Sequence, residues 1–129
     1  MYLDANVFVQ AILNTKETGK RARKLLSNIE NNKMTAYSSV LAFDEALWAI
    51  TKNKPDQRAK IWKILLSIPN LRILDINKPV AIRVNEFLEK GIKPRDSIHL
   101  ALMFEYGIDI IISEDKHFDN IKGIIRRSI

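Results

Sequence analysis

The sequence predicts a single α/β domain over residues 1–129, with a mostly parallel central sheet of four to five strands and helices on both faces. Short apolar runs, which are typical of strands, alternate along the chain with longer segments whose apolar residues recur at helical spacing. The continuous isoleucines within 109–113 are typical of a strand covered on both faces. No linker or low-complexity stretch interrupts the chain, whose length suits one domain.

Strands are expected where short apolar segments end in polar or turn-forming residues. In chain order these segments are 2–4, 34–37, 71–76, 109–113 and a last edge strand at 123–126. Helices are expected where apolar residues follow helical spacing, at 5–13, 19–30, from Ser38 or Ser39 up to Asn53, 55–67, 79–90 and 94–106. Pro94 suits a first helical position, and Gly91 suits a C-terminal cap.

Three of these helices have apolar residues that predict which faces are buried. The helix after Ser39 is expected to be substantially buried, with Val40 and Trp48 included. The expected apolar faces are Ala59, Trp62, Leu65 and Leu66 on helix 55–67, and Ala81, Ile82, Val84 and Leu88 on helix 79–90.

The composition is that of a basic protein without cysteine. Twenty-one Lys and Arg against fifteen Asp and Glu leave a net charge of +6. This charge fits either a surface that attracts nucleic acid or a lysine-rich solubilising surface. The absence of cysteine excludes disulfides and thiolate metal sites. With no apolar run of membrane-spanning length and no signal peptide, a cytoplasmic protein without membrane contact is expected.

Four acidic residues share features that favour one explanation. Asp4 and Asp115 lie just beyond apolar strands, Asp96 lies in the first turn of a helix, and Glu45, next to Asp44, lies in the middle of a largely apolar helix. Each alone has a structural explanation, such as a helix cap or an exposed position. Together in one crevice they would repel one another, and bound cations would remove that penalty. All-oxygen ligands favour Mg²⁺ or Mn²⁺.

The chain resembles the PIN-domain proteins, and in size it resembles the VapC ribonuclease toxins of VapBC toxin–antitoxin pairs. The matching motifs, in order, are Leu3–Asn6, Ser39–Glu45, Pro94–Ala101 and Ile112–Phe118. No single motif is specific, but the four in this order together are a fairly strong match. Asn6 stands where a haloacid-dehalogenase-type phosphatase needs a second aspartate, and a receiver domain would need an acidic pair that only Asp4 resembles.

The resemblance implies roles for named residues. Asp4, Glu45, Asp96 and Asp115 match the metal-binding and catalytic positions, and Asn6 and Ser113 match polar positions that support them. Arg95, beside Asp96, is either a residue that binds a substrate phosphate or simply an exposed arginine. Asp44, next to Glu45, and Asp119, near the rim, are left as undecided acids. His99 is expected to be a structural histidine and His117 an exposed one.

The function that the resemblance implies is metal-dependent cleavage of RNA. A single Mg²⁺ or Mn²⁺ ion, or a pair, would serve an endoribonuclease that is the toxin of a type II toxin–antitoxin system. The implied partners are an RNA substrate, a second copy in a homodimer and a VapB-like antitoxin. The alternative is a catalytically inactive PIN-fold module that binds RNA or protein.

Overall fold

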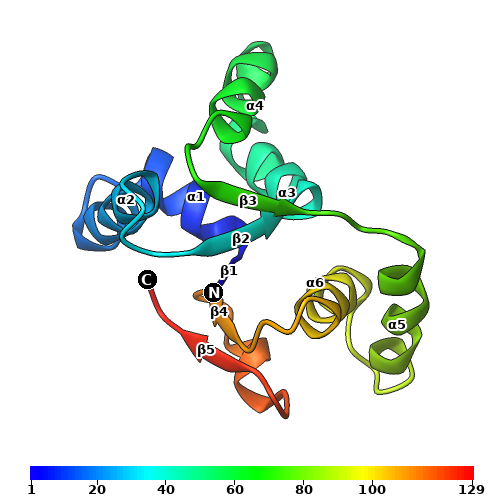
Figure 1. Ribbon diagram of the computed structural model, residues 1–129. Coiled ribbons are helices and arrows are strands. Elements are labelled where there is room, and N and C mark those ends of the chain that lie inside the picture. The colour runs from blue at the N-terminus through cyan, green and yellow to red at the C-terminus, as the bar shows by residue number, and fades with distance from the viewer.

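The computed structural model describes all 129 residues as alternating strands and helices (Figure 1). The strands are β1 (Tyr2–Leu3), β2 (Ala36–Ser39), β3 (Leu71–Leu74), β4 (Ile110–Ile112) and β5 (Ile125–Arg127). The α-helices are α1 (Ala5–Leu13), α2 (Glu17–Glu30), α3 (Val40–Thr51), α4 (Arg58–Leu66), α5 (Lys78–Leu88) and α6 (Pro94–Glu105). Two short 3₁₀ helices, η1 (Pro55–Gln57) and η2 (Lys116–Asn120), complete the elements. None of the helices is long and apolar enough to cross a bilayer.

The five strands form one sheet in the order β3-β2-β1-β4-β5, and every pair is parallel. The predicted α/β class is therefore confirmed, and the sheet is entirely rather than mostly parallel. The second strand starts at Ala36 rather than at 34, and it runs to Ser39, whose side chain caps α3. Helix α2 begins at Glu17, two residues before the predicted start. Within its first turn, Gly19 lies so close to Asn14 that a Cβ there would meet the Asn14 carbonyl oxygen.

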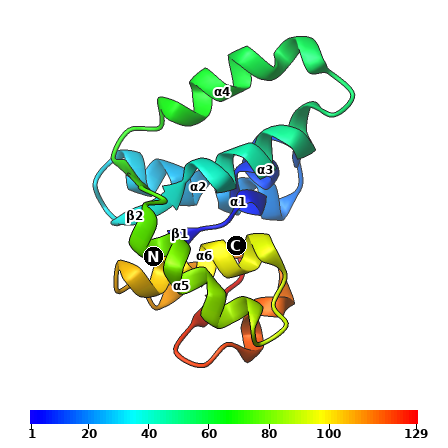
Figure 2. The ribbon, with the colours of Figure 1, turned by 90° about the vertical axis from the view of Figure 1, so that its right-hand side faces the viewer.

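Helices cover both faces of the sheet, as Figure 2 shows from the side. Neighbouring strand residues point to opposite faces, so Leu3 and Ile112 join a core with α1 to α4. Tyr2 and Ile111 join a second core with α5, α6 and η2. The two apolar layers leave the strand ends as the place where polar side chains from both sides can meet.

The predicted faces of three helices are wrong in part. Val40 and Trp48 on α3 are exposed, Trp48 at 62% of its surface, because the buried face of this helix consists of the smaller Ala42 and Ala46 with Phe43. On α4, Trp62 and Leu65 pack inward but Ala59 and Leu66 are exposed. On α5 the buried residues are Val80 and Phe87, whereas Ala81, Ile82 and Leu88 are exposed.

The strand order creates one point where the direction of winding reverses. From β1 the chain moves outward to β2 and β3, then returns to place β4 on the other side of β1. Ligands of open α/β sheets bind in the crevice outside the carboxyl ends of the strands at such a switch point. Asp4 follows β1, and Ser113 and Asp115 follow β4, so all three lie at this position.

Candidate metal centre

Asp4 is a buried carboxylate at the start of α1, with only 8% of its surface exposed. It caps the helix by accepting a hydrogen bond of 2.7 Å from the backbone N–H of Ala5. Burial raises the pKa of its carboxyl above the ordinary value, and the hydrogen bond from Ser113 opposes that rise. Asp4 is therefore both a helix cap and a buried acid at the switch point, and the two roles do not exclude one another.

Asn6 and Ser113 hold this carboxylate from two sides. The Ser113 hydroxyl donates to Asp4 Oδ2 at 2.6 Å, and the Asn6 side-chain amide donates to the same oxygen at 2.8 Å. The same amide also donates to Ser113 Oγ at 3.0 Å, and Ser113 Oγ accepts from the backbone N–H of Asp115 at 3.0 Å. This network ties the end of β1 to the end of β4 and fixes the loop that carries Asp115.

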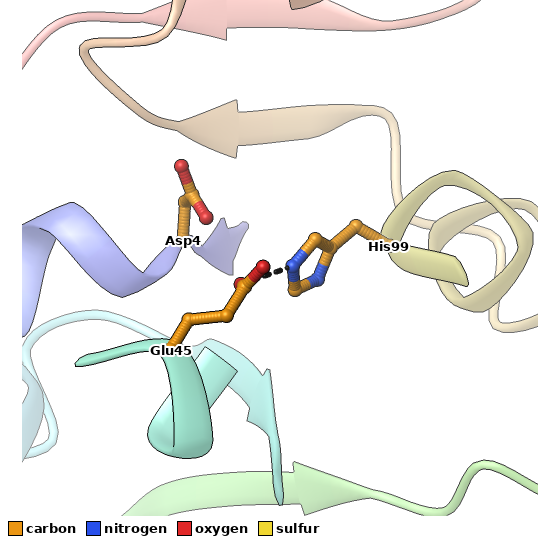
Figure 3. Close-up of side chains that lie close together, drawn as sticks. All are labelled: Asp4, Glu45 and His99. Atoms are coloured by element: carbon orange, nitrogen blue, oxygen red, sulfur yellow. Dashed lines mark hydrogen bonds and ion pairs between the residues drawn. The ribbon is translucent and has the colours of Figure 1, made fainter. Parts of the chain in front are cut away.

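Glu45 enters the same region from α3 and is held by a buried histidine (Figure 3). His99 of α6, 1% exposed, places Nε2 at 2.8 Å from Glu45 Oε2. A carboxylate oxygen only accepts, so His99 donates through Nε2–H. The oxygens of Asp4 and Glu45 and a ring nitrogen of His99 all lie within 4.8 Å of one another.

The histidine is in turn oriented by a buried tyrosine. Tyr2 places its hydroxyl at 2.7 Å from His99 Nδ1 and at 2.7 Å from Ser39 Oγ. With the histidine hydrogen on Nε2, Tyr2 donates to Nδ1 and accepts from Ser39, while Ser39 accepts from the N–H of Ala42 at 3.2 Å. Every polar atom of this buried chain then has a partner. The chain Ser39–Tyr2–His99 thus fixes one oxygen of Glu45.

Asp96 and Asp115 form a second acidic group with His117. Their carboxylate oxygens and a ring nitrogen of His117 also lie within 4.8 Å of one another. Asp115 caps η2 by accepting from the backbone N–H of His117, and the same oxygen lies 2.9 Å from His117 Nδ1. Partial burial raises the pKa of Asp96, and the negative charge of Asp115 raises it further. Asp96 makes no hydrogen bond that would offset this repulsion.

One open cavity of about 470 Å³ joins the two groups. Glu45, Asp96 and Asp115 line it. Three residues with positive or titratable side chains also line it, namely Lys93, Arg95 and His117. Arg95 lies 3.9 Å from Glu45 and is 66% exposed, so it can turn toward a ligand at the mouth.

The two undecided acids lie away from this cavity. Asp44 is exposed on α3 and belongs to neither acidic group. Asp119 forms a two-point contact with Arg126, which also donates to the backbone oxygen of Ser113 at 2.9 Å. This guanidinium holds the pKa of Asp119 below its ordinary range. Of the adjacent pair on α3, only Glu45 faces the other acids.

Sequence reasoning missed the contacts of three residues. His99 was expected to be structural, and it is buried and fully bonded, but one of its partners is Glu45 itself. The available signal was its position three residues after Asp96, on the same side of one helix. His117 is exposed as expected, yet it pairs with Asp115. Tyr2 carried no signal beyond its place two residues before Asp4.

The donor set of this centre fits a hard divalent cation. Carboxylate oxygens from four separate elements make up most of it, each group adds one histidine nitrogen, and no thiolate is present. Burial and the neighbouring acids raise the pKa of Asp4 and of Asp96, so gathering these negative charges is unfavourable in the chain alone. A cation bound among these oxygens would balance that charge.

Comparison with known proteins identifies the family. The model of the PIN domain matches residues 1–124. A chain of VapBC2 from Rickettsia felis, solved with a DNA fragment from its promoter, is 20% identical, with 98% of this chain and 96% of that chain covered and a TM-score of 0.70. DNA-bound VapBC from Salmonella typhimurium is 21% identical over the same shares, with a TM-score of 0.72.

A third solved structure with this fold is VapC20 from Mycobacterium tuberculosis, described as a toxin that cleaves the sarcin–ricin loop. It is 15% identical, with 92% of each chain covered and a TM-score of 0.72. No protein with a curated description matches the sequence significantly. At these identities the structural neighbours show a shared fold, and the family match over nearly the whole chain shows descent. The chain therefore belongs to the PIN domain family.

Proposed function

We propose that this protein is a divalent-metal-dependent endoribonuclease and the toxin of a type II toxin–antitoxin pair. The observation that carries the proposal is the meeting of Glu45, Asp96 and Asp115 in one cavity beside the buried Asp4. Gathered carboxylates repel one another, and acids with pKa values shifted in this way are typical of functional sites. Membership in the PIN domain family makes nuclease chemistry the best match for such a centre.

Asp4, Glu45, Asp96 and Asp115 would hold Mg²⁺ or Mn²⁺, with Asn6 and Ser113 supporting Asp4. Each of the two acidic groups has ligand atoms close enough to hold an ion, which agrees with one ion or with a pair. When bound, such an ion lowers the pKa of water and neutralises charge on phosphoryl oxygens. The donor chemistry described above supports a hard ion, and either Mg²⁺ or Mn²⁺ satisfies it.

The remaining work belongs to side chains around the cavity. Asp115 has one oxygen, Oδ2, that accepts no hydrogen bond from the protein, so it is better placed than Asp4 to take a proton from an attacking water. Arg95 would bind a phosphate beside the bond that is cut, and the Lys93 ammonium adds positive charge at the same cavity. Their contribution would be electrostatic and therefore sensitive to salt. Unpaired RNA suits a site of this kind because its backbone bends into a crevice.

The partners are proposed from the exposed apolar surface and from the solved neighbours. Exposed apolar side chains on α3 and α4, among them Trp48, Ile64 and Leu66, offer surface for a second copy or for an antitoxin. Two of the solved neighbours are VapBC complexes, which supports a VapB-like antitoxin for this chain. The proposal includes a homodimer, a VapB-like antitoxin and a cytoplasmic location. Light scattering of the purified protein tests the dimer, and a strictly monomeric protein would contradict it.

The decisive experiment compares two neighbouring acids on α3. Purified wild-type protein should cleave single-stranded RNA with Mg²⁺ or Mn²⁺ and lose this activity when the metal is chelated. Glu45→Gln should lower cleavage by more than about 100-fold, because even groups behind metal ligands cost about 10- to 100-fold when lost. Asp44→Asn removes an equal charge one residue away, on the exposed face, and should leave cleavage unchanged.

Two other outcomes would reject the proposal. If Glu45→Gln and Asp44→Asn cleave equally well, the activity comes from another site or from a contaminant. If metal-loaded wild-type protein cleaves no RNA, the result supports the alternative, a PIN-fold module that binds RNA or protein without cutting it.

A further inference from the structure

A second cavity, of about 220 Å³, opens directly beside the acidic one. Its apolar lining consists of Ile92 before α6, Leu100 on α6, and Phe118 and Ile121 around η2. Leu100 and Phe118 are buried, so they form a fixed floor, while Ile92 and Ile121 are half-buried at the sides. The cavity is therefore an apolar slot between a helix and a short 3₁₀ turn.

This slot shares a wall with the acidic centre. Lys93, Asp96 and His117 line both cavities. The ring of His117 is held by Asp115 at 2.9 Å, so it stands at the border between the slot and the carboxylates. A cation bound by Asp96 and its neighbours would hold an anionic group of a ligand. The part of the ligand next to that group would then lie in the slot.

We propose that the slot binds one unpaired nucleobase of the RNA, next to the phosphate that the acidic centre engages; this rests on the proposed nuclease function and adds a base-binding subsite to it. Single-stranded RNA is recognised by bases that are splayed out of the stack onto apolar and aromatic side chains, histidine included. The slot offers the apolar floor and the histidine ring, and the Lys93 ammonium at its edge is a donor for acceptor atoms of a base.

The size of the slot favours a single base over larger ligands. Pockets for drug-sized molecules measure roughly 300–1,000 Å³. At about 220 Å³ the slot is smaller than that range, which suits one ring system and not two stacked bases. One unpaired base at a set distance from the cut would give the enzyme a sequence or structural preference that phosphate contacts cannot supply.

The first test uses nucleosides and needs no nuclease activity. Adenosine, guanosine, uridine and cytidine are titrated separately into ¹⁵N-labelled wild-type protein, with ribose as the control that lacks a base. At least one nucleoside should shift the backbone amide signals of Gly91, Ile92 and Ile121 in a saturable manner, and ribose should not. If no nucleoside shifts these signals more than ribose does, the base-binding proposal is overturned, whether or not the protein cleaves RNA.

The second test fills the slot. Ile121→Trp places a large side chain in the cavity, whereas Ile125→Trp adds the same side chain at an exposed position on β5 that does not line it. Ile121→Trp should abolish the nucleoside shifts and raise KM for single-stranded RNA by about tenfold, the order expected for loss of one stacked base. Its Mn²⁺ affinity should stay at the wild-type value, and Ile125→Trp should behave as wild type in all three measurements.

The outcomes separate the two proposals. Nucleoside binding in the slot without RNA cleavage would keep the base subsite and reject the nuclease. RNA cleavage with equal KM for wild type and Ile121→Trp would keep the nuclease and reject the subsite. If Ile121→Trp does not fold, the nucleoside titration of the wild-type protein decides the question alone.

Discussion

Replacing Asp96 by asparagine is expected to abolish RNA cleavage and at the same time to raise the thermal stability of the metal-free protein. The cleavage should fall by more than about 100-fold, because the change removes a proposed metal ligand. The stability of the folded state should rise because the Asp96 carboxylate is partly buried near Asp115. Burial and the charge of Asp115 raise its pKa, and no hydrogen bond offsets the cost of burying the ionised group. The asparagine keeps the shape and loses the charge.

The pH dependence has a definite sign. The unfolded chain releases the Asp96 proton near the ordinary pKa of 3.8, while the folded chain holds it to a higher pH. Between these two values the folded state binds more protons than the unfolded state, so stability falls as pH rises through that window. Above the window the full penalty remains. Wild-type protein without metal should therefore lose more stability than Asp96→Asn when pH rises from below 3.8 to neutral.

Bound metal should make the wild-type protein more stable than Asp96→Asn. A ligand that binds only the folded state adds about 2.7 kcal/mol at 100 times its Kd. Thermal unfolding with and without Mn²⁺ at pH 7 measures both effects, and Asp56→Asn, an exposed first-turn acid on η1, serves as the matched control. If Asp96→Asn is no more stable than wild type without metal, the Asp96 carboxylate carries no burial cost. If the variant gains as much stability from Mn²⁺ as wild type does, Asp96 does not belong to a metal centre.

The second large effect is expected at His99, a residue that touches a proposed ligand without being one itself. His99→Ala removes the donor to Glu45 and leaves the buried hydroxyl of Tyr2 without one of its two partners. Removing a residue that hydrogen-bonds a metal ligand lowers metal affinity by about 10- to 100-fold. Affinity for Mn²⁺ should fall by that amount, and RNA cleavage at low Mn²⁺ should fall with it.

Two conservative variants distinguish positioning from simple packing. A glutamine at position 99 can donate to Glu45 and accept from Tyr2, so His99→Gln should restore part of the Mn²⁺ affinity. Tyr2→Phe keeps the ring and removes only the hydroxyl between Ser39 and His99, so its loss should be smaller than that of His99→Ala. The readout is free Mn²⁺ followed by electron paramagnetic resonance during titration.

The control for lost stability is Phe87→Leu on α5. This change weakens the apolar core that also contains Tyr2, at a position away from the carboxylates. All variants are compared below their unfolding temperatures. Equal Mn²⁺ affinity in His99→Ala and Phe87→Leu would show that His99 only fills the core, and the positioning role would have to be abandoned.

Local patterns were sufficient for most of the fold. The isoleucine run of β4, the serine cap of α3 and the proline at the start of α6 are signals carried by neighbouring residues, and the structure has an element at each. Burial was harder to predict because it depends on which neighbour covers a face. Trp48 looks like a core residue by spacing, yet Phe43 and two alanines fill the buried side of α3 and leave Trp48 outside.

The sequence by itself determined which acids stand at strand ends and helix starts, since these positions follow from local pattern and from the ordered motifs of the PIN domain. Only the tertiary structure decided which oxygens meet. Asp4 and Ser113 are 109 residues apart in the chain and 2.6 Å apart in space, because β1 and β4 are neighbours in the sheet. Because α3 and α6 pack at the same strand ends, Glu45 faces the other acids while Asp44 faces solvent, and His99 contacts Glu45. Strand order and helix packing depend on the whole chain, and no single stretch of sequence contains them.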